Sequence, residues 1–159
     1  MVKGKRKINL PLILAPSGAI PIIFMVICYL NDVDRLNFFY INLNIENFIV
    51  TYCIAILTFV SGIKWGFATI TKISDSAINI PLPSNLLFLF SNFITLAAVS
   101  LLLVEDFLLK ILLIVMLFYL QLFIDLKVAR HLPEWFKYMR IVATVLITAP
   151  LLVLLIALQ

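Results

Sequence analysis

Four polar side chains lie within apolar runs of this sequence and could meet in the fold. Lys64 stands between two glycines in SGIKWG, while Gln121 and Asp125 stand four residues apart in LQLFID. Residues with this spacing share one face of a helix. Arg140 follows in a third apolar segment. Because charges in apolar surroundings generally pair with each other, we expect an ion pair of Asp125 with Lys64 or with Arg140. The alternative is that each charged side chain reaches water separately.

The sequence offers little for catalysis. Its one histidine, His131, has no cluster of metal ligands beside it. It contains no glycine-rich phosphate loop, no G-x-S-x-G turn and no H-E-x-x-H motif. Cys28 and Cys53 lie in apolar runs, which indicates packing rather than a disulfide or a metal site. We therefore expect no catalytic residue, no cofactor, no metal and no enzyme activity.

The composition indicates a membrane protein. Of the 159 residues, 64% are hydrophobic and 13% are charged, whereas a soluble domain is roughly half apolar and about a quarter charged. One small core cannot hide so much apolar surface. We expect a single integral membrane domain over residues 1–159. The basic segment MVKGKRK is too short to indicate nucleic-acid binding, and we interpret it as a retained anchor on the cytoplasmic or matrix side.

The lengths of the apolar stretches define the fold class. A hydrocarbon core of ~30 Å needs about 20 residues of helix. We therefore predict an all-α bundle of five transmembrane helices at residues 11–30, 48–70, 85–104, 107–128 and 136–158. The first helix carries Pro11, Pro16 and Pro21, which predict a kink. A break that frees backbone groups is the alternative.

The connections between these helices are short. Residues 36–48, LNFFYINLNIENF, fit either a helix on the membrane surface or an irregular loop. Glu105 and Asp106 form a tight turn between the third and fourth helices. Lys110 stands four residues after Asp106, which predicts an ion pair between them.

Lysine and arginine residues set the expected orientation. With the N-terminus inside, the outer flanks carry only Arg35 and Lys110, together with five of the eight acidic residues. The C-terminus then lies outside, because an odd number of spans separates the two ends. The inner flanks carry the other basic residues near the helix ends: Lys3, Lys5, Arg6, Lys7, Lys72, Lys127, Arg130, Lys137 and Arg140.

This orientation places the charged residues of the apolar runs in one inner layer. Lys64 lies 16 residues after Phe48, which is about 24 Å along the second helix. Asp125 lies about 27 Å along the fourth helix, and Arg140 stands near the start of the fifth. We therefore expect these three residues to form, with Gln121, a polar cluster at the inner mouth of the bundle.

Small and polar residues predict contacts between helices. Gly62 and Gly66 have a small-xxx-small spacing that allows close helix contact, and they point away from Lys64. We expect this glycine face to pack on the segment Ser17-Gly18-Ala19 of the first helix. In the third helix, hydrogen bonds to neighbouring helices are expected for Asn85, Ser91, Asn92 and Thr95.

Several segments resemble a known family. They are PSGAIPIIF in the first helix, YCIAILTFVSGIKWG in the second, and LQLFID followed by LPEWFKYMR. Their order and spacing are similar to those of the domain-of-unknown-function family typified by human mitochondrial transmembrane protein sixty-nine. The resemblance covers roughly residues 11–158, and it implies a small polytopic inner-membrane protein of a bacterium or a mitochondrion. The family's recurrent residues map onto Gly62, Lys64, Trp65, Gly66, Gln121, Asp125, Pro133, Trp135 and Arg140.

These features favour a non-catalytic role. We expect an accessory subunit or assembly factor of a larger membrane complex, such as a respiratory one, with lipid and protein partners and no nucleic acid. One alternative is a small oligomeric transporter or channel, with a continuous polar path from Asn92 to Lys64 and Asp125. Another is a membrane-embedded protein that holds a lipid or a quinone in an apolar cleft ending at Asp125 and Arg140.

Overall fold

The computed structural model describes residues 10–38, 41–73, 83–128 and 133–158, and long helices dominate it. In chain order, the elements are α1 (Leu10–Ser17), α2 (Ile20–Leu30), β1 (Arg35–Phe38), β2 (Ile41–Asn44), α3 (Ile45–Ile73), α4 (Ser84–Ser100), the 3₁₀ helix η1 (Leu101–Leu103), α5 (Phe107–Val128) and α6 (Glu134–Ala157). Five helical stretches are long and apolar enough to cross a membrane: Ile13–Leu30, Ile45–Thr69, Ser84–Leu103, Phe107–Val128 and Glu134–Ala157. The five predicted spans are therefore present, with bounds close to those expected.

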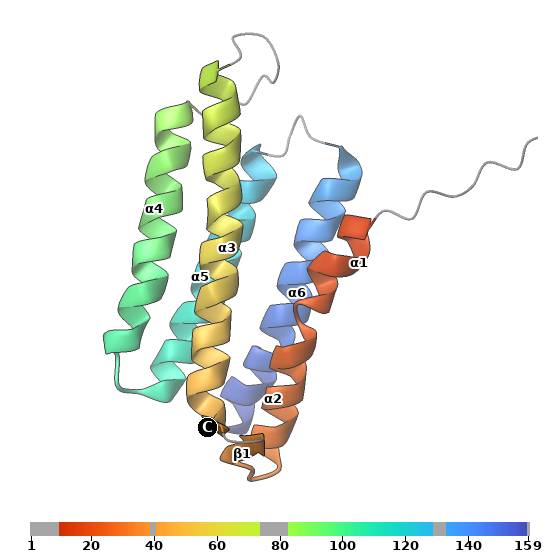
Figure 1. Cartoon of the computed structure of the whole chain (residues 1–159), viewed down its shortest axis with the longest axis vertical. Coiled ribbons are helices and arrows are strands. Elements are labelled where there is room, and N and C mark those ends of the chain that lie inside the picture. The colour runs from red at the N-terminus through yellow and green to blue at the C-terminus, as the bar shows by residue number, and fades with distance from the viewer. Residues whose placement is uncertain (1–9, 39–40, 74–82, 129–132, 159) are drawn as a thin grey trace, which may run out of the picture.

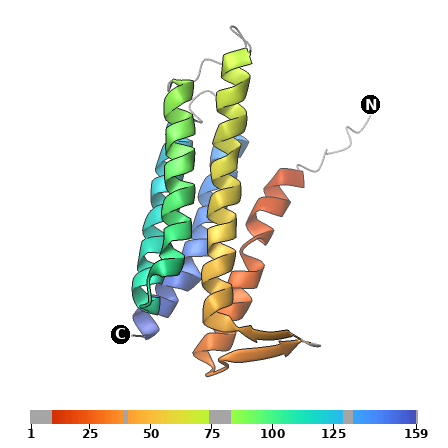
Figure 2. The same cartoon turned by 60° about the vertical axis from the view of Figure 1, so that its left-hand side comes forward.

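The helices form a bundle, with α3 at the front in the view of Figure 1. α3 packs most extensively against α4 and also against α2 and α5, while α6 packs against α1, α2 and α5. Figure 2 shows the start of α1 and the end of α6 at opposite ends of the bundle. We call the end that carries β1 and β2 the hairpin end, and the end at which α3 stops and α6 begins the loop end. Which end faces the inside of a cell or organelle stays a prediction.

The first span is broken rather than kinked, so α1 and α2 are separate helices. Pro21 has no N–H to donate into the preceding turn, and the N–H of Ala19 donates to the carbonyl of Pro16 at 3.0 Å. The carbonyl of Gly18 accepts a hydrogen bond of 3.1 Å from the hydroxyl of Tyr52 on α3. The expected kink is therefore wrong, and the alternative of a freed backbone group describes this span.

The segment predicted as a surface helix or an irregular loop, residues 36–48, is a β-hairpin followed by the first turn of α3. β1 and β2 pair antiparallel, with Arg35 opposite Asn44. Before the hairpin, Asp32 takes a positive φ of 57° in the turn that ends α2. After it, Asn44 caps α3, because its side-chain oxygen accepts the N–H of Asn47 at 2.9 Å. The hairpin is thus fixed between one helix end and the next helix start.

Asp106 caps α5 instead of pairing with Lys110. Its Oδ1 accepts the N–H of Leu109 at 2.6 Å, the bond that is typical of a helix N-cap. Lys110 forms no ion pair within the described part of the chain. The prediction of an Asp106–Lys110 pair is therefore wrong, because the carboxylate turns back toward the backbone of its own helix.

Two apolar cores fill the bundle. The larger one lies toward the hairpin end, where Ile22, Leu57 and Leu151 are completely buried. The smaller one lies toward the loop end, between α3, α4 and α5, and contains Ala68 and Leu87. Buried positions on α3 recur every three or four residues through both cores, which is the spacing of one helix face.

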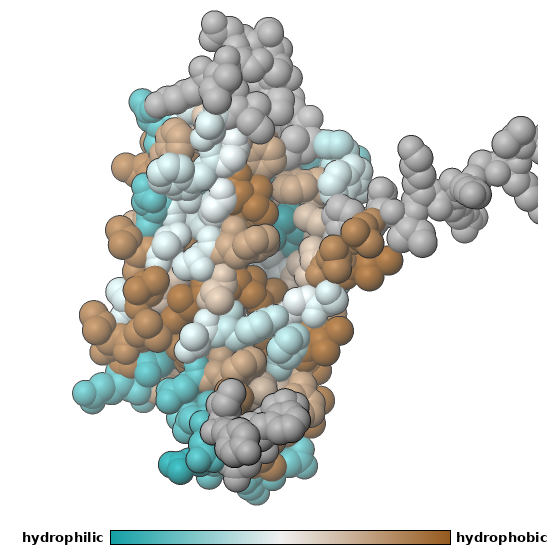
Figure 3. Space-filling view, in the orientation of Figure 1, coloured by the Kyte–Doolittle hydropathy of each residue, from teal (hydrophilic) through white to brown (hydrophobic). Residues whose placement is uncertain are grey.

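The exterior of the bundle is apolar. Large hydrophobic side chains point outward from several elements, and Phe59, Leu103 and Ile156 are 76%, 86% and 74% exposed. Figure 3 shows apolar atoms over the flanks of one side and hydrophilic atoms at the hairpin end. A soluble monomer rarely exposes so much apolar surface, whereas hydrocarbon solvates it. Composition and surface agree that this is a membrane protein.

Candidate functional site

Three helices bring one carboxylate and two cations together toward the loop end. α5 contributes Asp125, α3 contributes Lys64 and α6 contributes Arg140. Lys64 Nζ lies 2.9 Å from Asp125 Oδ1, and Arg140 Nη2 lies 2.6 Å from Asp125 Oδ2. The sequence predicts one ion pair or the other, and both form at once. We call these three residues and Gln121 the ionic cluster.

The two oxygens of Asp125 are divided between the cations. Arg140 also donates from Nε to Oδ2 at 2.7 Å, so both guanidinium contacts fall on one oxygen. Oδ1 receives the Lys64 ammonium and accepts a long hydrogen bond of 3.4 Å from Gln121 Nε2. The Lys64 contact is an ion pair, with Nζ 2.9 Å from Oδ1. Gln121 and Asp125 share one helix face, as their spacing predicts.

The ionic cluster is almost fully enclosed. The exposed fraction is 2% for Lys64, 8% for Asp125, 6% for Arg140 and 0% for Gln121. Taking a charge out of water costs several kcal/mol unless protein groups replace the solvent. Asp125 can neutralise only one of its two partners. With both cations charged, the cluster therefore carries a net charge of +1.

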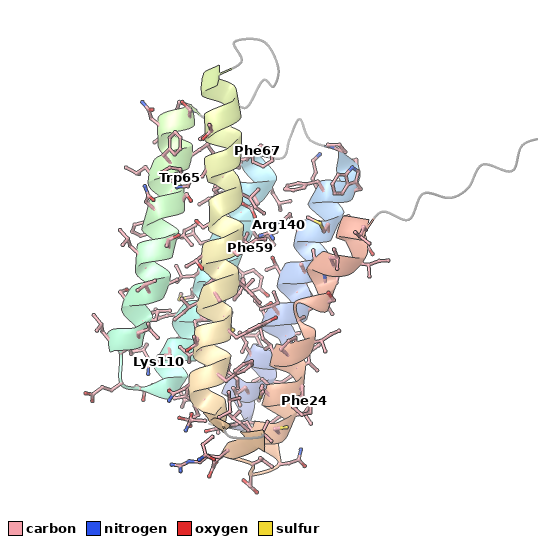
Figure 4. The ribbon with its side chains drawn as sticks, in the orientation of Figure 1. Phe24, Phe59, Trp65, Phe67, Lys110 and Arg140 are labelled. Atoms are coloured by element: carbon pink, nitrogen blue, oxygen red, sulfur yellow. The ribbon has the colours of Figure 1, made fainter. Side chains whose placement is uncertain are left out.

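A small cavity adjoins the cluster. Its volume is about 10 Å³, roughly the space that one water needs. Besides the three charged side chains, its walls include Phe67 and Phe136, whose rings meet edge to face with centroids 6.2 Å apart. Figure 4 shows Arg140 at a level between Phe59 and Phe67 on α3. A substrate-sized molecule does not fit this cavity.

The glycine face lies on the outside of the bundle, contrary to the prediction. Gly62 and Gly66 are exposed, and a Cβ added at either position would meet nothing within 4 Å. The expected partner, Gly18, meets α3 at Tyr52 instead. The helical spacing does set the glycines opposite Lys64. It is the lysine side, however, that packs inward, because its ion-pair partners lie there.

Two serines, Ser61 and Ser91, join α3 to α4, and the sequence predicts a role only for Ser91. Ser61 Oγ donates to the carbonyl of Ser91 at 2.8 Å, and Ser91 Oγ donates to the carbonyl of Ser61 at 2.7 Å. The interhelical bond expected of Ser91 is confirmed. Ser61 was missed, although it lies one turn from Lys64 on the same face. Asn92 is exposed on α4 and makes no interhelical bond within the described residues, so that expectation is wrong.

The remaining predicted residues surround the cluster without belonging to it. Trp65 and Trp135 are 48% and 40% exposed, and the Trp65 ring meets Phe88 edge to face with centroids 4.8 Å apart. Pro133 occupies the N-cap position of α6. Other predicted positions lie outside the described residues: the basic N-terminal segment, the side chain of Lys72, Arg130 and His131.

The cluster holds three helices together. Both oxygens of Asp125 are engaged by cations, so the carboxylate is not free to serve as a base. Within the ranges that the structure describes, no three His, Cys, Asp or Glu side chains gather in a way that could hold a metal ion. The arrangement therefore acts as an ionic joint between α3, α5 and α6.

The fold and the ionic joint define a class: a small membrane protein of five membrane-length helices with a buried ionic cluster toward one end. Within this class, the chain belongs to the family described as protein of unknown function (DUF3429), whose family model matches residues 8–156. A comparison with curated proteins and a comparison with solved structures found no match. The prediction of an uncharacterised domain family is confirmed, and its link to transmembrane protein sixty-nine stays a prediction.

Proposed function

We propose that this chain is a non-catalytic accessory subunit or assembly factor of a larger membrane complex. The observation that carries the proposal is an outer face of the α3–α4 pair that another helix would complete. The resemblance to the family typified by mitochondrial transmembrane protein sixty-nine favours the inner membrane of a bacterium or a mitochondrion, where the complex could be a respiratory one.

The outer face follows from the serine pair. Ser61 and Ser91 face each other across the neighbouring helices α3 and α4. Gly62 and Asn92 each come one residue later, and in antiparallel helices that step turns both to the same outer side. Both residues are exposed, and Gly66 lies one turn beyond Gly62 with open space before it. We call Gly62, Gly66 and Asn92 the α3–α4 face.

The chemistry of the α3–α4 face suits a transmembrane helix of another protein. Two glycines one turn apart let a second backbone approach closely. Asn92 lies in the middle of α4, where hydrocarbon offers its amide no hydrogen bond. A partner helix could supply that bond, which is worth about 0.6 kcal/mol on average and up to about 1.7 kcal/mol in a membrane. Lipid alone gives the Asn92 amide no hydrogen bond and places no helix backbone against the two glycines.

The alternative functions receive less support from the geometry. A transporter would need a polar path from Asn92 to the ionic cluster, but Asn92 lies on the exposed side of α4. A quinone-binding protein would need a cleft at Asp125 and Arg140, where the cavity has a volume of only about 10 Å³. The described residues provide neither this path nor this cleft.

The test is to extract the protein from native membranes with a mild detergent and to identify the proteins that co-migrate with it on a native gel by mass spectrometry. We expect a larger complex of fixed stoichiometry, and we expect the double variant Gly62→Leu, Asn92→Leu to be released from it. The matched control is Ala149→Leu, which enlarges an exposed small residue on α6 and should stay bound. Migration of the wild type alone, or as a small homo-oligomer, would overturn the proposal.

A further inference from the structure

The charges of the ionic cluster do not balance. Lys64 and Arg140 face a single carboxylate, and Gln121 adds no charge. Among the described acidic side chains, Asp125 alone forms an ion pair with either cation. A net charge of +1 in surroundings this dry is costly unless an anion joins it or Lys64 gives up its proton.

The donors of the cluster also outnumber its acceptors. Lys64 Nζ is buried, and its contact with Asp125 Oδ1 at 2.9 Å engages at most one of the three ammonium N–H groups. Gln121 Oε1 is one acceptor of the cluster that accepts no hydrogen bond within the described part of the chain. Arg140 directs Nε and Nη2 to one oxygen of Asp125, and the other N–H groups of the guanidinium take no part in that contact. An ammonium and a guanidinium with free N–H groups are the side chains that proteins use to hold phosphate oxygens.

The cavity limits what can reach these donors. Lys64 and Arg140 both line it, and its volume of about 10 Å³ admits one oxygen-sized atom. A whole phosphate does not fit, so the rest of any anion has to stay outside the cavity. This favours an anion that inserts one oxygen from the flank of the bundle. In Figure 3 a hydrophilic patch is visible between α3 and α1, in the region where Figure 4 labels Arg140.

The cluster lies near the loop ends of α5 and α6, toward one of the two headgroup layers. Asp125 lies three residues before Val128, the last residue of α5, and Arg140 lies six residues after Glu134, the first of α6. These separations correspond to about 5 and 9 Å along the helices. The polar layer on each side of a bilayer is about 5–8 Å thick. Basic pockets between transmembrane helices at this level are known to receive anionic headgroups.

We propose that Lys64 and Arg140, balanced in part by Asp125, form a binding site for one anionic phosphate oxygen, supplied by a lipid headgroup or by free phosphate. The anion neutralises the excess positive charge and occupies the small cavity as a fixed part of the fold, not as a substrate. This site is independent of the proposed subunit function and goes beyond it.

The experiment uses the full chain in frozen maltoside micelles, which contain no phosphorus. One arm adds phosphatidylglycerol, a second adds inorganic phosphate without lipid, and a third adds phosphatidylcholine, whose phosphate carries its own cation. Solid-state NMR measures the dipolar coupling between a lysine ¹⁵Nζ and ³¹P. We expect coupling to one lysine in the first or second arm, which identifies the source, and weaker coupling in the third. No coupling in either of the first two arms, or equal coupling with phosphatidylcholine, would overturn the proposal.

Variants identify the lysine. Lys64→Gln should weaken binding of the coupled probe by about tenfold or more, because a hydrogen bond to a charged group is lost. The matched control is Lys127→Gln, which removes the same charge from an exposed position at the same end of the bundle and should leave binding unchanged. Equal binding by wild type and Lys64→Gln would refute the site, as would an equal loss in both variants. If Lys64→Gln does not fold, Lys64→Arg keeps the charge but removes the lysine ¹⁵Nζ, so it should abolish the coupling, and a coupling that persists in Lys64→Arg would refute the site.

Discussion

Arg140 holds one oxygen of Asp125 through two nitrogens, Nε at 2.7 Å and Nη2 at 2.6 Å. The second oxygen is thereby left to Lys64 on a different helix. One carboxylate consequently ties α5 to both α3 and α6. Loss of that carboxylate would remove the ionic link between the three helices and would leave two buried cations without a counter-charge.

The first prediction concerns this carboxylate. Asp125→Asn should lower the free energy of unfolding by about 3–5 kcal/mol, because both cations would remain buried without a counter-charge. Unfolding in mixed micelles with increasing denaturing detergent measures the change. Glu134→Gln is the control, because its pair with Lys137 is largely exposed and should matter little. A loss smaller than about 1 kcal/mol for Asp125→Asn would show that the cluster is not the joint described here.

The second prediction concerns the serine pair between α3 and α4. Ser61→Ala and Ser91→Ala should each lower stability by about 0.6 kcal/mol, the average worth of a hydrogen bond between membrane helices. The double variant should cost less than the two single losses combined, because each substitution already removes a shared contact. Ser100→Ala serves as control, since its hydroxyl bonds only to the carbonyl of Ala97 in its own helix. If the stability loss of the double variant equals the sum of the two single losses, the two serines are not coupled and the prediction is wrong.

The third prediction concerns the break between α1 and α2. Tyr52→Phe removes the hydroxyl that donates to the Gly18 carbonyl at 3.1 Å, and it leaves a freed backbone acceptor without its partner. We expect a loss of about 1 kcal/mol and faster amide hydrogen exchange in α1 and the start of α2. Tyr138→Phe is the matched control, because that ring is 66% exposed. Unchanged exchange in α1 would mean that Tyr52 does not anchor the break.

The fourth prediction separates a helix cap from an ion pair. Asp106→Ala should cost about 1 kcal/mol, since the N–H of Leu109 would lose its acceptor. Lys110→Gln should be neutral, because Lys110 forms no ion pair within the described residues. Thermal unfolding of both variants in the same detergent provides the comparison. Similar losses of stability in the two variants would contradict the cap and would support the Asp106–Lys110 ion pair that the sequence suggests.

Depth along the helices was the part of the site that the sequence could predict. Counting residues from each helix start placed Lys64, Asp125 and Arg140 in one layer, and they meet there. The helix period also set Gly62 and Gly66 opposite Lys64. The period alone cannot tell which side faces inward. Glycines and a lysine can each face either way in a membrane, and only the positions of partner helices decide.

Local polar groups were harder to assign, because each has more than one partner within reach. Asp106 can bond to the backbone of its own helix or pair with a lysine one turn on, and sequence spacing allows both. Ser91 and Asn92 are neighbours of similar polarity, yet one is buried and the other exposed. The hairpin at residues 36–48 depends on the turn that ends α2 and on the cap at Asn44, which single-residue preferences do not reveal.

The ionic joint also fixes an order of events during synthesis. Lys64 enters the chain 61 residues before Asp125. At ~5–20 residues per second, Lys64 is therefore synthesised about 3–12 s before the carboxylate of Asp125 exists. In that interval the Lys64 ammonium can be solvated only if its side chain extends toward water at the loop end. The ion pair that joins α3 to α5 forms only after α5 has been synthesised. A chain truncated after α4 should leave Lys64 reactive toward a water-soluble amine reagent, and the full chain should protect it.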